Sequence, residues 1–260
     1  MNFKLVLSIA ALSVASVSYA QDWGTLKAKF ILDGKAPMPE KANINKDIEV
    51  CGKHKIVDET YKINAETGAI QNVVVFLSPK PGSPKPKIHP DYEKAPTDVV
   101  LDNHNCHFVP HIVILRTTQK LVIKNSDPVG HNTKADFFNN TSFNDLIPAG
   151  GSIAKTLAKS ESAFMPASCS IHPWMSAKIL VRDDPYAAVS NDKGELTIEN
   201  IPAGKWTFTV WHEGCGFVTS AKQGGKTVEW KKGKLDFEIK KGSNDLGEVK
   251  IPVSVLTKAK

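Results

Sequence analysis

The stretch Cys169-Ser-Ile-His172-Pro-Trp-Met175 places a thiolate, an imidazole and a thioether three residues apart on one short segment. A second imidazole, that of His131, lies upstream in the run Asn125-Ser-Asp-Pro-Val-Gly-His-Asn-Thr133. Soft sulfur ligands suit Cu(I), imidazole suits both oxidation states of copper, and two His, one Cys and a weak axial Met are the ligands of blue-copper centres. The pattern therefore predicts one type 1 copper site, in which Cys169, His172 and Met175 are joined by a second imidazole, with His131 as the candidate.

Each of these residues taken alone has an ordinary explanation. A single His or Met in a β-protein is more often a surface or core residue than a ligand, and a lone Cys is often half of a disulfide. The copper interpretation gains its weight from the joint occurrence of all four ligand types in the required order, with Pro173 and Trp174 inside the loop.

The loop and the strand that follows it, Ser176 to Val181, resemble the ligand loop of the cupredoxins, in particular the amicyanin and plastocyanin branches. The resemblance covers about residues 106 to 182 and includes the runs Phe108–Leu115, Lys120–Asn125, Gly130–Asn132 and Ile147–Gly151. It implies the same four copper ligands, with Asn132 tying the first-ligand segment to the Cys loop. It also implies that His172 reaches the protein surface as the electron exit. We expect Pro173 and Trp174 to form an apolar contact surface around it, with a core-capping role for Trp174 as the alternative. Pro166 departs from the family pattern, so the strand entering Cys169 is expected to be bulged or to start late.

Short runs of β-branched and aromatic residues, separated by clusters of Gly, Pro, Asn and Asp, predict an all-β chain. We expect a cupredoxin-like Greek-key β-sandwich followed by a second, smaller antiparallel β-sandwich. The expected division is a signal peptide over 1–20, a copper domain with a long N-terminal insertion over 21–182, and the second sandwich over 183–260. Within the insertion, Leu26–Leu32 and Val73–Leu77 read as strands, and Ser78–Pro86, with its four prolines, reads as an exposed loop.

The segment Val189–Trp211 is expected to form a hairpin, with turns at Asn191–Gly194 and Pro202–Gly204. Its buried faces are expected to consist of Leu196, Ile198, Ile201, Trp206, Phe208 and Val210. It resembles the carboxypeptidase-regulatory or transthyretin-like β-sandwich module. The tandem of a cupredoxin and this module is similar to exported bacterial proteins of the methylamine-utilisation type. Further strands are expected at Thr227–Trp230, Lys234–Ile239 and Glu248–Val253.

Residues 1–20 have the features of a secretory signal, with Lys4, an apolar run from Leu5 to Val17, and Ser18-Tyr-Ala20 before the cleavage point. We therefore expect a soluble protein that is periplasmic or otherwise exported. The apolar run is too short to span a membrane, and no later run approaches ~20 apolar residues. The formal net charge of +6 is scattered along the chain, which argues against a nucleic-acid partner.

Four cysteines are present. In an oxidising compartment Cys51 and Cys106 are the expected disulfide partners. The alternative is a second metal site, because His54, His104, His107 and His111 lie near these cysteines in the sequence. Cys215 is the remaining cysteine, expected to be buried or to bridge two molecules.

The function expected first is transfer of single electrons between redox proteins by a type 1 copper protein, with a transient redox partner. The alternatives are copper sequestration or delivery, and a non-redox envelope module that binds a polysaccharide or a protein through the C-terminal sandwich. We expect no enzymatic activity, because Ser168 and Ser170 flank Cys169 where a copper oxidase or nitrite reductase has a His. No Gly-x-Ser-x-Gly, His-Glu-x-x-His or phosphate-loop motif is present in the sequence.

Overall fold

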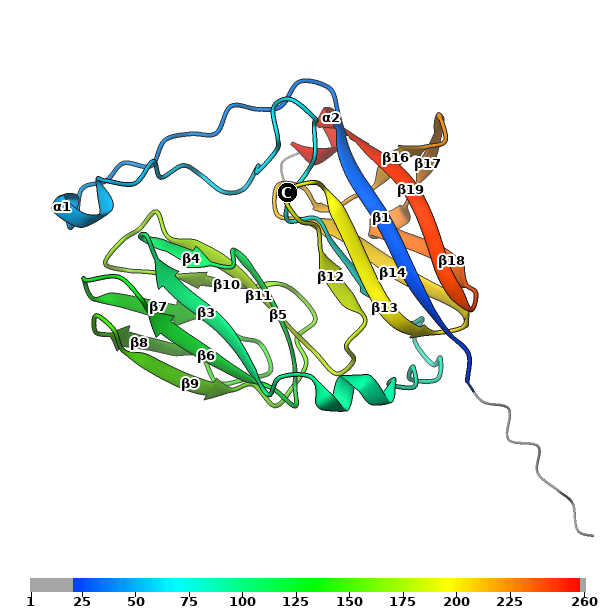
Figure 1. The fold of residues 1–260 in the computed structure, drawn as a ribbon, viewed down its shortest axis with the longest axis horizontal. Coiled ribbons are helices and arrows are strands. Elements are labelled where there is room, and N and C mark those ends of the chain that lie inside the picture. Colours follow the sequence, from blue (N-terminus) through cyan, green and yellow to red (C-terminus); the bar gives the residue numbers. More distant parts are fainter. Residues whose placement is uncertain (1–20, 258–260) are drawn as a thin grey trace, which may run out of the picture.

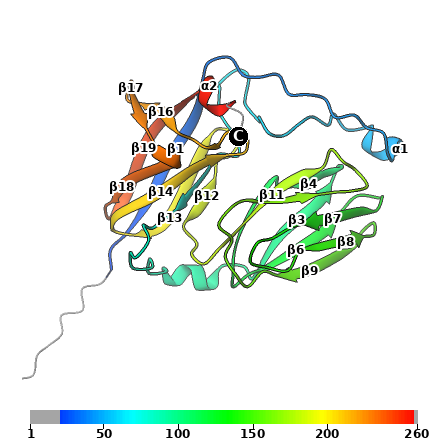
Figure 2. The same ribbon diagram turned by 180° about the vertical axis from the view of Figure 1, so that it is seen from behind.

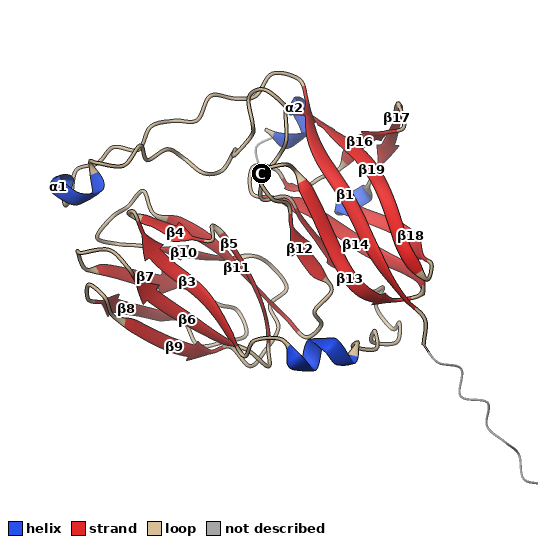
Figure 3. Ribbon diagram, in the orientation of Figure 1, coloured by secondary structure: helices blue, strands red, loops and turns tan. Residues whose placement is uncertain are grey.

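A computed structural model describes residues 21–257 and shows an all-β chain, as predicted. Two β-sandwiches lie side by side, and helices are short and few (Figures 1 and 3). The expected signal peptide lies outside the described residues. Within the described residues, no helix has both the length and the apolar character needed to cross a membrane.

The central sandwich, residues 98–182, contains the Cys169 loop. One of its sheets has the order β5-β11-β10-β7-β8 and the other has the order β4-β3-β6-β9. Side chains such as Leu121, Ile123 and Ile179 fill the space between them. The strands are β3 (Asp98–His104), β4 (His107–Val109), β5 (Ile112–Arg116), β6 (Lys120–Asn125), β7 (His131–Ala135), β8 (Phe143–Ile147), β9 (Ser152–Thr156), β10 (Met165–Ser168) and β11 (Ser176–Arg182).

The terminal sandwich is built from both ends of the chain. One sheet has the order β13-β1-β19-β16-β17; the other has the order β12-β2-β14-β15, with β18 also paired to β14. Its strands are β1 (Trp23–Asp33), β2 (Val74–Leu77), β12 (Ala187–Val189), β13 (Glu195–Pro202), β14 (Gly204–His212), β15 (Gly216–Phe217), β16 (Ser220–Gln223), β17 (Lys226–Glu229), β18 (Lys234–Ile239) and β19 (Gly242–Pro252). Over residues 21–257, the helices are α1 (Ile48–Cys51), α2 (Val253–Leu256), and the 3-10 turns η1 (Pro90–Lys94) and η2 (Lys231–Gly233).

The pairing of β1 and β2 differs from the expected division at residue 182. β1 runs parallel to β19 and antiparallel to β13, while β2 lies between β12 and β14. Residues 23–33 and 74–77 therefore belong to the sheets of the terminal sandwich and not to the unit that carries the Cys169 loop. Alternation of apolar and polar residues predicts β1, and a short continuous apolar run predicts β2. Neither pattern carries information about a partner at the far end of the chain.

The expected hairpin over 189–211 is also wrong. Its two strands, β13 and β14, lie in different sheets, so the turn at Pro202–Gly204 is a corner between the sheets. The residues expected to be buried do face the shared core: Leu196, Ile198, Ile201, Phe208 and Val210 are buried, and Trp206 is half-buried. The alternation of apolar and polar residues therefore predicts the buried faces of these strands, but it does not predict their pairing. The proline-rich segment is largely exposed, as expected.

Residues 34–73, between β1 and β2, form an extended arm that reaches over the central sandwich (Figures 1 and 2). Its outgoing and returning segments are linked by hydrogen bonds from Ala42 N to Ile56 O and from Asp58 N to Glu40 O. Helix α1 lies at its tip, where the predicted disulfide between Cys51 and Cys106 is confirmed, with an S–S distance of 1.99 Å. The arm is thus attached covalently to the central sandwich.

A polar cluster around the buried His111 joins the two sandwiches and the arm. His111 lies just before β5, and its Nε2 is 2.5 Å from an oxygen of Glu213 in the terminal sandwich. Its Nδ1 is 3.6 Å from Glu59 of the arm, and Lys178 of β11 forms an ion pair with Glu213 at 2.8 Å. Burial disfavours the charged imidazole, but the two carboxylates outweigh this effect and raise the pKa of His111 to about 9. Residue His212, beside Glu213 in the sequence, is buried, so the two do not form a solvent-exposed pair at a turn.

We expect His111 to make stability depend on pH. Since its folded-state pKa, about 9, exceeds the ordinary value of 6.5, its contribution is complete below pH 6.5 and is lost as pH rises through 9. The difference between these two pKa values corresponds to a contribution of about 3 kcal/mol to the free energy of unfolding. In urea unfolding, H111Q should be less stable than the wild type at pH 6. Between pH 6 and pH 9, H111Q should lose less stability than the wild type does. H104N, which removes an exposed imidazole, is the control; an unchanged pH profile in H111Q would contradict the assignment.

Candidate metal centre

The loop from Cys169 to Met175 is closed by its own backbone. Met175 N donates to His172 O at 2.9 Å, and Cys169 N donates to Met175 O at 3.3 Å. The His172 N–H points to the Cys169 sulfur at 3.4 Å. The preceding strand β10 spans only Met165–Ser168, with the exposed Pro166 paired to β11 but not to β7. The strand begins one residue before the proline and is not bulged there, but its pairing with β7 begins only after it, at Ala167.

Three of the predicted ligands meet in the interior. His131 begins β7, and one nitrogen from it, one from His172, and the Cys169 sulfur all lie within 4.8 Å of one another. The sulfur is 3.7 Å from His172 Nδ1. Both imidazoles are 0% exposed and Cys169 is 2% exposed. Met175, also 2% exposed, packs in the same core cluster.

Each histidine forms a hydrogen bond with a carboxylate through its Nε2. His131 Nε2 is 2.8 Å from Asp127 Oδ2, and His172 Nε2 is 2.8 Å from Asp47 Oδ2. Because an ionised carboxylate only accepts hydrogen bonds, each Nε2 must carry the hydrogen, and each neutral ring is left with a lone pair on Nδ1. His131 Nδ1 is buried without a hydrogen-bond partner among the described residues.

These donors fit a copper ion. In the neutral ring, a buried acceptor with no donor is costly, and either a proton or a metal ion on Nδ1 would satisfy it. Ligating histidines almost always donate their other ring N–H to a carboxylate, carbonyl or water, which fixes the tautomer and orientation of the ring. Two imidazoles and a thiol suit copper, and a thioether such as that of Met175, which packs in the same core cluster, is a usual weak ligand in such sites. Cys106 also lies near Asp127 and His131, but its sulfur is bonded to Cys51, so it is not a thiolate ligand. The alternative of a second metal site at these two cysteines is not supported.

The charges around the sulfur favour its ionised form. Burial raises the pKa of the Cys169 thiol, but His131 and the nearby backbone N–H groups outweigh burial and lower it below its usual value. Burial likewise opposes the charged form of His131, yet Asp127 and Cys169 raise the pKa of that imidazole to about 9. For His172, burial and the neighbouring His131 lower the pKa in spite of Asp47. The site thus stabilises a thiolate, which is the form that binds metal.

Asn132 ties the two ligand segments together, as the resemblance implied. Its Oδ1 accepts from the backbone N–H of Ser170 at 2.7 Å and of Ile171 at 3.2 Å. Its Nδ2 donates to Asn144 Oδ1 at 2.6 Å. The side chain of one strand residue therefore fixes the conformation of the Cys loop.

Removing this tie should weaken both the fold and the site. We expect N132A to lower stability by about 2 kcal/mol, because two loop N–H groups lose their acceptor, and to lower copper affinity about 10–100-fold. N144A is the matched control, since it removes only the bond to the amide nitrogen. Urea unfolding and competition with a chromophoric copper chelator measure the two effects; equal behaviour of the two variants would show that Asn132 does not organise the loop.

Other expectations about the site need correction or completion. His172 does not reach the surface, because Asp47 of the arm covers its outer nitrogen. Trp174 is half-buried and donates to Cys106 O at 3.2 Å, so it caps the core more than it offers a docking surface. Sequence reasoning missed the roles of Asp127 and Asp47. Asp127 stands four residues before His131, within the run that was singled out, whereas nothing in the sequence points to Asp47.

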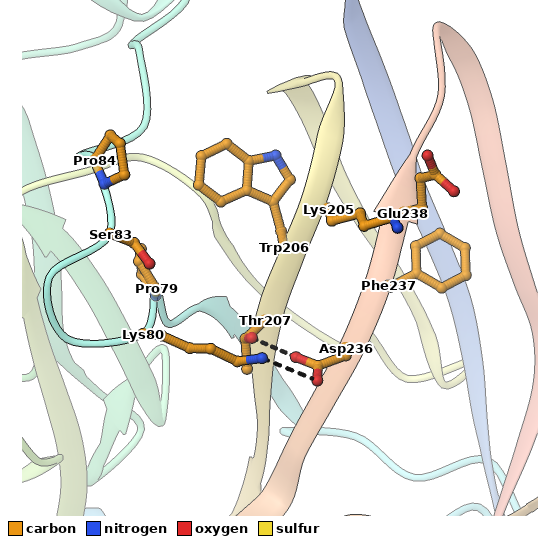
Figure 4. A pocket seen from close by; sticks show the side chains of 10 residues that line it. All are labelled: Pro79, Lys80, Ser83, Pro84, Lys205, Trp206, Thr207, Asp236, Phe237 and Glu238. Carbon is orange, nitrogen blue, oxygen red and sulfur yellow. Dashed lines mark hydrogen bonds and ion pairs between the residues drawn. The ribbon is translucent and has the colours of Figure 1, made fainter.

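A separate open groove of about 520 Å³ lies in the terminal sandwich, between the proline-rich segment and strands β14 and β18 (Figure 4). Trp206 faces Pro84 across it. The polar groups at its lower edge already bond to one another, since Asp236 accepts from Thr207 and pairs with Lys80 at 3.4 Å. None of its contacts indicates a polysaccharide or a protein ligand.

No family model and no curated protein matches the chain. Among solved structures, a copper-containing nitrite reductase from Thermus scotoductus SA-01 is 20% identical over 34% of this chain, with a TM-score of 0.31, and this chain covers 23% of that one. A Cu(I) methionine-to-alanine mutant of amicyanin is 14% identical over 42% of this chain and 98% of its own, with a TM-score of 0.30. A purple cupredoxin from Nitrosopumilus maritimus is 19% identical over 33% of this chain and 99% of its own, with a TM-score of 0.28. These TM-scores are low, so the chemistry proposed below rests on the geometry of the site.

Proposed function

We propose that the protein binds one copper ion at His131, Cys169, His172 and Met175 and transfers single electrons between redox proteins. The observation that carries this proposal is the pair of buried imidazoles that share one thiol, each with its Nε2 held by a carboxylate. Copper in such a site supplies a one-electron Cu(II)/Cu(I) couple.

The residues of the chain would keep that couple poised for transfer. Asp127 and Asp47 hold the two rings, and Asn132 holds the Cys loop, so the ligands have little freedom to rearrange. Burial of Cys169 and both histidines keeps water from the sulfur. The N–H of His172 directed at the sulfur stabilises negative charge on it. A rigid, dry ligand set suits electron transfer, in which little should move.

The expected setting is an exported protein with a transient redox partner and without enzymatic activity of its own. In support, the ligand loop is flanked by Ser168 and Ser170 and contains no further His beside Cys169, and a disulfide joins Cys51 to Cys106, which is the usual state in an oxidising compartment.

Voltammetry of the copper-loaded protein, combined with transfer of copper to a chelator, tests this function. An electron-transfer protein should cycle reversibly between Cu(II) and Cu(I) many times and lose its metal slowly in both states. Rapid transfer of Cu(I) from the protein to a chelator would support a role in copper delivery instead. A protein that binds no copper would favour the non-redox binding module.

A further inference from the structure

The arm supplies a polar group to the outer edge of His172. Asp47 lies in the arm, far from the other site residues in sequence, yet its Oδ2 lies 2.8 Å from Nε2 of His172. His172 is 0% exposed and the Asp47 side chain is 32% exposed, so the carboxylate stands between the imidazole and solvent. The edge of His172 that would otherwise face outward is thus covered by a residue from outside the central sandwich.

The local backbone indicates that Asp47 is placed for this contact. It occupies the N-cap position of α1, where an Asp side chain ordinarily accepts a hydrogen bond from a helix N–H. Here the side chain makes no such bond, and the residue has φ 45° and ψ 45°, in the left-handed region that L-residues seldom adopt. The carboxylate therefore contacts His172 in place of its usual partner. Strained residues of this kind cluster at functional sites.

The disulfide connects this contact to the other ligand histidine. On the arm side, the backbone N–H groups of Val50 and Cys51 donate to Asp47 O at 2.9 and 2.8 Å, so the turn that holds Asp47 ends on the bridged cysteine. On the opposite side, the N–H of Cys106 donates to Asp127 at 2.8 Å, and Asp127 orients His131. One covalent bridge thus links the two carboxylates that hold the two histidines.

Packing keeps the arm in place along the rest of its length. Ala42, Ile44, Val50 and Ile56 contact the core of the central sandwich, and Ile56 is 5% exposed. These apolar contacts flank the segment that carries Asp47. The packed arm therefore holds Asp47 in a fixed position beside the site.

We propose that the disulfide-tethered arm completes the metal centre, with Asp47 as the positioning residue of His172. This inference rests on the proposed function for its effect on copper, and on geometry alone for its effect on His172. A carboxylate on the outer nitrogen makes the imidazole a stronger donor and so favours Cu(II) over Cu(I). It also shields the ring from reagents in solution.

Two measurements on D47A, D47N and E49Q test the proposal. Glu49 is exposed and lies on the same short helix, so E49Q removes one charge without touching His172. In the copper-loaded protein, D47A should raise the reduction potential by an amount equal to about a tenfold change in the ratio of Cu(II) to Cu(I) affinity, about 59 mV for one electron. D47N keeps a neutral acceptor and should lie between D47A and the wild type, while E49Q should match the wild type.

The second measurement needs no metal. Diethyl pyrocarbonate acylates accessible imidazole, and peptide mass spectrometry reports each histidine separately. In the copper-free protein, His172 should react about tenfold faster in D47A than in the wild type or E49Q, while the buried His131 serves as the internal reference. Equal His172 reactivity in D47A and E49Q, or an unchanged potential in D47A, would overturn the role of Asp47. Failure of the wild type to bind copper would instead overturn the proposed function, and the acylation rates would still decide whether Asp47 positions His172.

Discussion

Replacing Cys169 with serine should abolish the intense visible band of the copper-loaded protein. That band requires charge transfer from a thiolate to Cu(II), and serine offers only a neutral hydroxyl. Copper affinity should also fall, by at least about 100-fold, since removal of even an outer partner of a ligand typically costs 10–100-fold. Absorption spectroscopy and chelator competition measure the two effects.

The matched control is C215S, because Cys215 lies in the terminal sandwich, where it packs against a different core. This variant should keep the band and the affinity of the wild type. If C169S kept a visible thiolate band, or if C215S lost it, copper would be bound elsewhere and the assignment of the ligand loop would be wrong.

Loss of the disulfide should have the largest effect on stability. The bridge closes a loop between residues separated by 55 positions, and restriction of the unfolded chain by a loop of that length corresponds to about 4 kcal/mol. The double variant C51S/C106S should lose about this much in urea unfolding. Because the bridge also tethers the arm, acylation of His172 in the folded, copper-free variant should be faster than in the wild type.

A separate measurement distinguishes the tether from a general loss of stability. H111Q also weakens the fold, through the cluster between the sandwiches, but leaves the arm tip bridged to Cys106. Each variant is acylated at a urea concentration that lies equally far below its own unfolding midpoint. Under these conditions, His172 should react faster in C51S/C106S than in H111Q. Equal rates would mean that the bridge stabilises the chain without closing the site.

The local parts of the site were predictable from sequence. Cys169, His172 and Met175 lie within one short loop, and their spacing and chemistry identify them without knowledge of the fold. His131 and Asn132 required the resemblance, because no spacing rule connects them to the loop. The structure brings His131, Cys169 and His172 together in the interior, and Asn132 bonds to the loop as implied.

The non-local parts were not predictable. The period of two along Leu26–Leu32 indicates a strand with one buried face, but the parallel partner of β1 is β19, at the opposite end of the chain. For the same reason, the role of Asp47 was not predictable, since an acidic residue in a loop is ordinarily exposed to solvent. The expectation of an exposed His172 failed for a related reason: the arm that covers it lies outside the region of resemblance.

Titration of Cu(II) into the metal-free protein, followed by visible absorption and electron paramagnetic resonance, tests the central claim most directly. If His131, Cys169 and His172 hold one ion between them, a strong thiolate-to-copper band should grow linearly and stop at one equivalent, with a resonance signal of matching intensity. A colourless titration, or a signal that indicates nitrogen and oxygen ligands without sulfur, would contradict the account.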